Sequence, residues 1–164
     1  MSKNIWIVSD THFGHYNIIR YSNRPFTTVN EMNDAMLTNW NETVKPDDIV
    51  WHLGDVYFKN PEIIPKLYGH KNLILGNHDS GKDQNLLNNF EKIEMGKAFK
   101  DMKLMLSHVP LHKSQLVAFP DTELLNVHGH IHEKDSPEGP YRNVSVEKTN
   151  YRPINIEELR IDKL

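Results

Sequence analysis

The chain contains no cysteine and no long apolar run. Without thiols it can form neither disulfides nor thiolate metal sites, so a metal ion would have to be bound by carboxylate, amide or imidazole groups. No apolar stretch approaches the roughly 20 residues that span a bilayer. The N-terminus carries one lysine before a short apolar segment and lacks the apolar core of a signal peptide. These absences predict a cytoplasmic protein without a membrane partner.

A large charge of one sign is also missing, because 19 lysine and arginine residues nearly balance 22 aspartate and glutamate residues, for a formal net charge of −3. No global field therefore attracts nucleic acid or an anionic membrane. A nucleotide substrate is not excluded, since bound metal ions would set the charge of a local site. The length of 164 residues is enough for one domain with a real core. We expect a single domain over residues 1–164 and no obligate protein partner.

Short apolar segments and periodic segments alternate along the chain. Apolar residues three and four positions apart predict one long helix, capped by Thr28 or Asn30. Its apolar face consists of Val29, Met32, Met36, Trp40 and Val44. Strands are predicted at 5–9, 49–52, 72–75, 93–98, 103–106, 143–146 and 152–156, and shorter helices at 61–68 and 85–90. Segments 93–98 and 103–106 are expected to pair, and the strand-rich end favours a mixed α/β arrangement.

Five short clusters hold residue types that bind divalent metals, and each follows an apolar segment. They are Asp10-Thr11-His12, Gly54-Asp55, Gly76-Asn77-His78-Asp79, Ser107-His108 and Gly129-His130-Ile131-His132. Taken alone, the clusters at 10–12 and 54–55 are more typical of turns, and Ser107-His108 is more typical of a structural histidine. The other two clusters are hard to explain as turns alone. Because ligands bind at the carboxyl ends of strands in open α/β sheets, the five clusters together predict one metal site. An extended backbone at 10–12 would point Asp10 and His12 to the same side.

Seven side chains in these clusters can donate to a metal, too many for one ion with an open position. They are Asp10, His12, Asp55, Asn77, His108, His130 and His132. Two divalent ions bridged by a carboxylate would use all seven. Mixed carboxylate, amide and imidazole ligands suit Mn, Fe, Ni or Zn better than Ca or Mg, and manganese is the first expectation.

The order D-x-H, G-D, G-N-H-D, H, G-H-x-H over positions 10 to 132 resembles the calcineurin-like metallophosphoesterase family. The local context 9–15, with Arg24-Pro25-Phe26 and the segment 143–153, is similar to a small bacterial and phage subgroup. The resemblance implies an α/β fold, a four-layer α/β/β/α sandwich of two mixed β-sheets flanked by helices. It also implies a binuclear metal-dependent hydrolase of phosphate esters, foremost a phosphodiesterase or nucleotide-type phosphoesterase.

The resemblance implies a role for each site residue. Asp10, His12, Asp55 and His132 would bind the first metal, and Asp55 would bridge to a second metal completed by Asn77, His108 and His130. A hydroxide held between the ions would attack phosphorus. His78 would face the substrate phosphate as an acid or transition-state stabiliser, with Asp79 orienting its ring.

Other interpretations remain open at this point. The His78-Asp79 doublet also occurs in HD-type phosphohydrolases, but there it lies on helices, and metallo-β-lactamase-like enzymes need an H-x-H-x-D-H run that is absent here. The main alternative is a non-catalytic metal-binding interaction scaffold of the same fold.

Several polar residues outside the clusters are assigned less directly. Asn17, Arg20 and Arg24 are predicted to bind phosphate oxygens or the leaving group, because guanidinium matches phosphate geometry. The alternative is a structural loop in which Arg24 pairs with an acidic neighbour. His52, His70 and His112 are expected to be structural or exposed, and His128 to support a ligand.

Overall fold

The computed structural model describes residues 3–118 and 121–160, and its first sheet has five strands. Four of them run parallel: β1 (Ile5–Val8), β2 (Ile49–His52), β3 (His70–Ile74) and β4 (Lys92–Glu94). The last strand, β11 (Ile154–Asn155), is antiparallel to β1 and makes the sheet mixed. The predicted strand at 49–52 is confirmed, and the one at 5–9 ends one residue earlier, at Val8.

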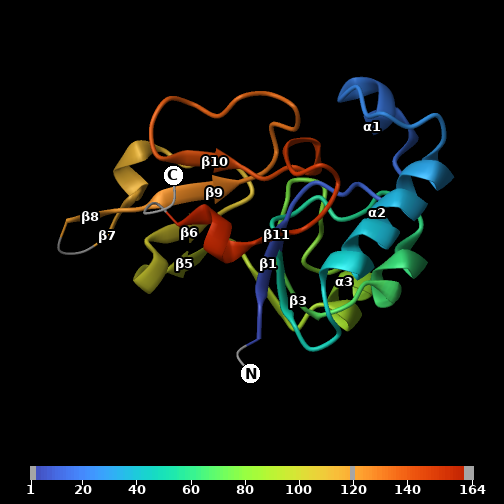
Figure 1. Ribbon diagram of the computed structural model, residues 1–164, viewed down its shortest axis with the longest axis horizontal. Helices are drawn as coiled ribbons and strands as arrows, with labels where there is room; N and C mark the ends of the chain where they lie inside the picture. Colours follow the sequence, from blue (N-terminus) through green and yellow to red (C-terminus); the bar gives the residue numbers. More distant parts are fainter. Residues whose placement is uncertain (1–2, 119–120, 161–164) are drawn as a thin grey trace.

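The second sheet has four strands in the order β10-β9-β6-β5. It contains β5 (Lys97–Phe99), β6 (Leu104–Leu106), β9 (Leu125–His128) and β10 (Tyr141–Asn143). Only β5 is antiparallel to its neighbour, so this sheet is mixed as well. A separate two-stranded ribbon of β7 (Val117–Ala118) and β8 (Thr122–Glu123) projects from it (Figure 1).

A shared apolar core joins the two sheets. Side chains alternate along β1, so that Ile7 enters this core while Val8 faces the helices. From the second sheet, Leu106 and Val127 enter the same core. The two predicted mixed sheets are therefore confirmed, and they pack face to face.

The helices pack on the outer face of the first sheet (Figure 1). They are α1 (Tyr16–Tyr21), α2 (Val29–Thr43), the 3₁₀ helix η1 (Pro61–Lys66) and α3 (Gln84–Asn89). Thr28 caps α2 by accepting a hydrogen bond from the Glu31 amide. Met32, Met36 and Trp40 bury the predicted apolar face of α2. The long helix predicted from this periodicity is confirmed.

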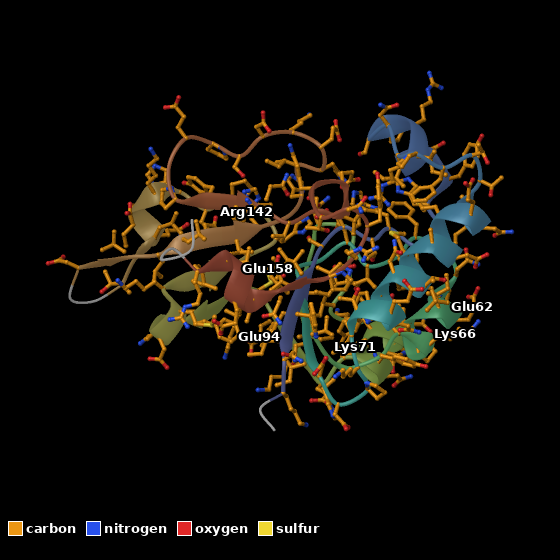
Figure 2. The ribbon with its side chains drawn as sticks, in the orientation of Figure 1. Glu62, Lys66, Lys71, Glu94, Arg142 and Glu158 are labelled. Atoms are coloured by element: carbon orange, nitrogen blue, oxygen red, sulfur yellow. The ribbon has the colours of Figure 1, made fainter. Side chains whose placement is uncertain are left out.

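The outer face of the second sheet carries the loop that leads to the short 3₁₀ turn η3 (Lys113–Gln115). The Asn126 side chain on β9 accepts a hydrogen bond from the Leu111 amide at 2.8 Å, just before η3. The other short turns pack elsewhere. Residues of η2 (Lys100–Met102) and η5 (Ile156–Leu159) pack in the core between the sheets, and Val146 of η4 (Val146–Lys148) packs in the core under the helices. Charged side chains of both signs lie together at the surface, as Glu62 and Lys66 do on η1 (Figure 2). Within the described residues, no helix has the length and apolar character needed to cross a membrane.

The strand predicted at 93–98 is wrong, because the structure has two separate strands there. The segment 93–98 is divided at Met95-Gly96, so that β4 pairs with β3 in the first sheet and β5 pairs with β6 in the second. A Cβ at Gly96 would lie 3.0 Å from Met105 Cε and 3.3 Å from the Leu106 carbonyl oxygen, so the chain lies close to β6 where it passes between the sheets. The strand predicted at 143–146 is also misplaced: the observed strand β10 covers Tyr141–Asn143, and Val146 begins η4.

Candidate metal centre

The five clusters meet at one edge, where the parallel strands of both sheets end. Backbone hydrogen bonds connect the first two clusters, from the Asp10 amide to the Gly54 carbonyl and from the His12 amide to the Asp55 carbonyl, each 3.0 Å. The Gly129 amide joins the last two clusters by donating to the His108 carbonyl at 2.9 Å. A Cβ at Gly129 would clash with the Ser9 and Asp10 side chains, so this close approach of the two sheets requires glycine.

Five of the seven predicted ligands have a left-handed backbone. The φ angles are 60° at Asp10, 49° at His12, 57° at Asp55, 69° at His130 and 52° at His132. The expectation that an extended backbone aligns Asp10 with His12 is therefore wrong, because the backbone is left-handed at both residues. Such conformations cost about 1 kcal/mol or more each and persist where the surrounding structure holds them, commonly at functional sites.

One group of ligand atoms forms around Asp10, His12 and His132. The Asp10 Oδ1 atom lies 3.9 Å from His12 Nε2 and 4.0 Å from His132 Nε2. Asp10 Oδ1 and His12 Nε2 are buried and have no hydrogen-bond partner among the residues that the structure describes. Buried polar atoms are rarely left unpaired, so these two atoms fit a site that a cation completes.

A second group contains Asp55, His108 and His130. The Asn77 Oδ1 atom joins it, 2.9 Å from His108 Nε2 and 3.0 Å from His130 Nδ1. The Asp55 Oδ2 atom lies 3.5 Å from His108 Nε2 and 3.4 Å from His12 Nε2 of the first group. Asp55 therefore stands between the two groups.

Further hydrogen bonds orient the clustered rings and carboxylates. The Nδ1 atom of His108 contacts the Leu53 carbonyl at 2.8 Å, and His132 Nδ1 contacts Glu147 Oε1 at 3.1 Å. Each bond occupies one ring nitrogen and directs the other toward the centre. Ser9 and Ser145 both donate to Asp10 Oδ2, which leaves Oδ1 facing the two histidines.

The electrostatics favour the metal-binding protonation states of Asp55, His12 and His130. Burial raises the pKa of Asp55, but the neighbouring His12 and His108 outweigh it and hold this pKa well below its usual range. Burial lowers the pKa of His12 and of His130, which keeps both rings neutral near pH 7. An anionic carboxylate beside neutral imidazoles is the form that coordinates divalent metal. For His132, burial lowers the pKa, but the hydrogen bond to Glu147 and the nearby carboxylates together outweigh burial and raise it.

The family model of the calcineurin-like phosphoesterase superfamily domain matches residues 4–148. The chain belongs to this superfamily. An uncharacterized protein of Methanocaldococcus jannaschii is 37% identical over 168 residues, which cover 94% of this chain and 88% of that protein. The gene 66 protein of Mycobacterium phage L5 is 34% identical over 90 residues, which cover 51% of this chain and 43% of that protein. The crystal structure of a protein of unknown function from Aquifex aeolicus matches with a TM-score of 0.75 and 29% identity, covering 99% of both chains.

Membership of the calcineurin-like superfamily confirms the family resemblance found in the motifs. It identifies a phosphoesterase domain, which implies a phosphate-ester substrate and a dependence on divalent metal. The two groups around Asp10 and Asp55 are candidate sites for that metal.

In this phosphoesterase domain, His78 is exposed and lines a cavity of about 580 Å³ beside the first group. Its amide donates to Asp55 Oδ1 at 2.9 Å, so the His78 backbone is attached to the residue between the two groups. Asp79 does not orient the His78 ring as predicted. Its carboxylate accepts from the amides of Asp55, Val56 and Gly76 at 2.8, 3.0 and 2.9 Å, and thus joins the β2 and β3 loops.

The structure places the three predicted substrate-binding residues differently. Asn17 lines the 580 Å³ cavity, whereas Arg20 is exposed in the last turn of α1 and does not line it. The prediction that Arg24 binds substrate is wrong, because this side chain is buried. It donates to Glu147, to the carbonyls of Asp10 and Thr11, and to Met32 Sδ, so it supports the first cluster from behind.

Sequence reasoning missed Glu147, whose Oε1 accepts from both Arg24 and His132 Nδ1. Its signals were an acidic residue directly after the strand predicted at 143–146 and its place in the segment 143–153 that resembles the bacterial and phage subgroup. His52 is structural, as expected: it is fully buried and contacts Thr11 Oγ1 at 2.9 Å. His128 does not support a ligand ring, because its two nitrogens contact the Gly129 carbonyl and Ser136 Oγ.

Proposed function

We propose that the protein is a phosphodiesterase that uses two divalent ions, with manganese as the first to test. Asp10, His12 and His132 would hold one ion, and Asn77, His108 and His130 the other, with Asp55 shared. The observation that carries this proposal is the position of Asp55 Oδ2, 3.4 Å from His12 Nε2 and 3.5 Å from His108 Nε2. One carboxylate oxygen between two imidazoles from different groups is suited to bridging two cations.

The residues present fit such ions. Within the described part of the chain, the buried Asp10 Oδ1 and His12 Nε2 atoms have no hydrogen-bond partner, and the donor set mixes carboxylate, amide and imidazole. Two divalent ions, when bound, would ionise a water molecule near neutral pH and offset charge on the phosphate. The chain's own contribution is a set of rings fixed by Leu53, Glu147 and the cluster backbones.

His78 is proposed to act on the leaving oxygen. Hydrolysis breaks one P–O bond, and the departing oxygen needs a proton, which a nearby imidazolium can supply. The His78 ring lines the cavity, and the Asp79 carboxylate fixes the loop that carries it through three backbone amides. Asp79 therefore positions His78 through the backbone.

A diester substrate is supported by two hollows that both reach the ligand cluster. The 580 Å³ cavity is lined by His12, His78 and His132. A second cavity of about 320 Å³ is lined by Asn77 and His108 of the other group. A phosphodiester carries two organic groups, and the two hollows offer each group its own space. We also propose that residues 1–164 form one domain, because both sheets share a single core.

The test is metal content measured together with hydrolysis of a 4-nitrophenyl phosphodiester. Asp55→Ala should bind less than one metal equivalent and lose turnover. His78→Ala should retain both metals but lose about 10²–10⁴-fold in kcat, with a smaller loss for better leaving groups. His70→Ala is the matched control, because this partly exposed ring pairs with Glu91 away from the site. Unchanged metal content in Asp55→Ala would eliminate the shared-carboxylate arrangement, and metal binding without hydrolysis would favour the scaffold alternative.

A further inference from the structure

The 580 Å³ cavity has one aromatic side, formed by His15, Tyr21 and Phe58 and called here the aromatic wall. The rings of His15 and Phe58 stack with centroids 4.0 Å apart and an interplanar angle of 13°. The Tyr21 ring meets His15 edge-on at 6.5 Å. Tyr21 lies on α1, His15 is the N-cap residue of this helix, and Phe58 lies in the loop after β2, so two separate segments build one surface.

Two rings of the aromatic wall are exposed to solvent and do not contribute to the hydrophobic core. Tyr21 is 68% exposed and Phe58 is 47% exposed, and neither belongs to a hydrophobic cluster of the core. Single exposed rings are common on protein surfaces. Here the two exposed rings line the same cavity as the candidate metal ligands His12 and His132, which associates the aromatic wall with that site.

The wall is joined to the candidate metal centre through its own contacts. His15 Nδ1 lies 3.3 Å from His12 Nδ1, and the Phe58 ring centroid lies 5.1 Å from that of His78. A phosphate seated against His12 and His78 therefore has the wall directly beside it. The rest of the cavity lining includes the polar side chains of Asn17, Ser22 and Lys134, which could meet the edge of a planar heterocycle.

We propose that the aromatic wall stacks the base of a nucleotide phosphoester whose phosphate occupies the candidate metal centre. This inference rests on the proposed function and names its substrate class. Every nucleobase offers a π-face, and aromatic side chains bind bases through that face with little regard to sequence. An alkyl or lipid group would instead match an aliphatic lining, such as the Leu75, Met95 and Val109 side chains of the second cavity.

The test compares two ligands that differ only in the base. Dissociation constants of adenosine 5′-monophosphate and ribose 5-phosphate are measured by calorimetry on the Mn²⁺-loaded protein. The nucleotide should bind the wild type about tenfold more tightly. Phe58→Ala and Phe58→Leu should each remove most of this difference while leaving the ribose 5-phosphate constant within about twofold. Tyr68→Ala is the control, because Tyr68 is 46% exposed but does not line the cavity.

The outcomes separate this inference from the proposed function. Equal affinity of the wild type for the two ligands would overturn the aromatic wall as a base site and leave the metal centre intact. A Phe58→Ala variant that weakens both ligands equally would also overturn it, because the ring would then act only through His15 and His12. If inorganic phosphate, ribose 5-phosphate and the nucleotide all fail to bind, the proposed function fails together with the wall.

Discussion

Single buried residues set the shape of the cluster loops, and His52 shows how. Its Nδ1 accepts a hydrogen bond from the Gly54 amide at 3.1 Å, so the proton of the neutral ring lies on Nε2, which meets Thr11 Oγ1 at 2.9 Å. Thr11 Oγ1 in turn donates to the Val56 carbonyl at 2.7 Å. One imidazole thus connects the turn at Asp10–His12 with the turn at Gly54-Asp55. Both turns carry proposed ligands, and the tautomer is defined by these partners.

His52 should make stability depend on pH. Burial lowers its pKa from 6.5 to about 3, so between these values the unfolded chain binds a proton that the folded chain does not. Stability therefore falls as pH decreases from about 6.5 toward 3. In His52→Gln, the loss of unfolding free energy between pH 7 and pH 5 should be smaller by about 2 kcal/mol, measured by urea denaturation. His112→Gln is the control, an exposed ring hydrated in both states. If the unfolding free energy of the wild type and of His52→Gln changes equally between pH 7 and pH 5, this account is refuted.

At the level of elements, Arg24 and Glu147 connect three segments of the chain behind the candidate metal centre. Arg24 lies in the connection from α1 to α2, Glu147 lies on η4, and His132 lies in the loop after β9. The Arg24 Nη2 atom is 2.8 Å from Glu147 Oε1, and both side chains are almost fully buried. Arg24 also donates to the carbonyls exposed by the left-handed turn at Asp10, so the pair supports a strained segment.

Removing the Glu147 charge should weaken metal binding without touching a ligand. Glu147→Gln leaves the Arg24 cation without its buried counter-charge and weakens the hold on His132 Nδ1. We expect metal affinity to drop by about 10–100-fold. Calorimetric titration with Mn²⁺ measures this directly. Glu157→Gln makes the same chemical change in an exposed pair with Arg160 and should change affinity little. Equal affinities in the two variants would show that Glu147 has no part in positioning His132.

At the scale of the whole molecule, the candidate metal centre joins the two sheets. Asp10, His12, Asp55 and Asn77 follow strands of the first sheet, whereas His108, His130 and His132 follow strands of the second. Each of the two groups contains residues from both sheets. Ions bound there would connect the two sheets at the edge where the five clusters lie. Metal binding and folding stability should therefore be linked.

Metal removal should accordingly lower thermal stability. An ion present at about 100 times its dissociation constant adds about 2.7 kcal/mol to the folded state. For a chain of this size that corresponds to a rise in Tm of about 5–10 °C for each ion. Calorimetric scans with Mn²⁺ and after chelation measure the difference. In Asp55→Ala the rise should be largely lost, whereas His70→Ala should keep it. A Tm independent of chelator would mean that the centre binds no metal in the folded protein.

Much of the site was readable from local patterns. The five clusters and their order predicted the family. Metal ligation needs particular donor types at short spacings, and both can be identified from the sequence alone. The helix over α2 and the strand β2 were likewise predicted, since each depends on the periodicity of its own apolar residues. These features depend on neighbours a few positions away.

Contacts between distant residues were not readable in this way. Arg24 and Glu147 pair across 123 positions, and no local pattern distinguishes a buried arginine from one that faces substrate. The predicted strand is divided at Met95-Gly96 because the chain passes there from one sheet to the other. The pattern of apolar residues in this segment does not show which sheet each part joins. The left-handed backbone at Asp10 and His12 is held by Arg24 and by the Gly54-Asp55 turn, partners that only the folded chain brings near. Donor chemistry is a local property of the chain, whereas the support and strain of those donors arise from long-range packing.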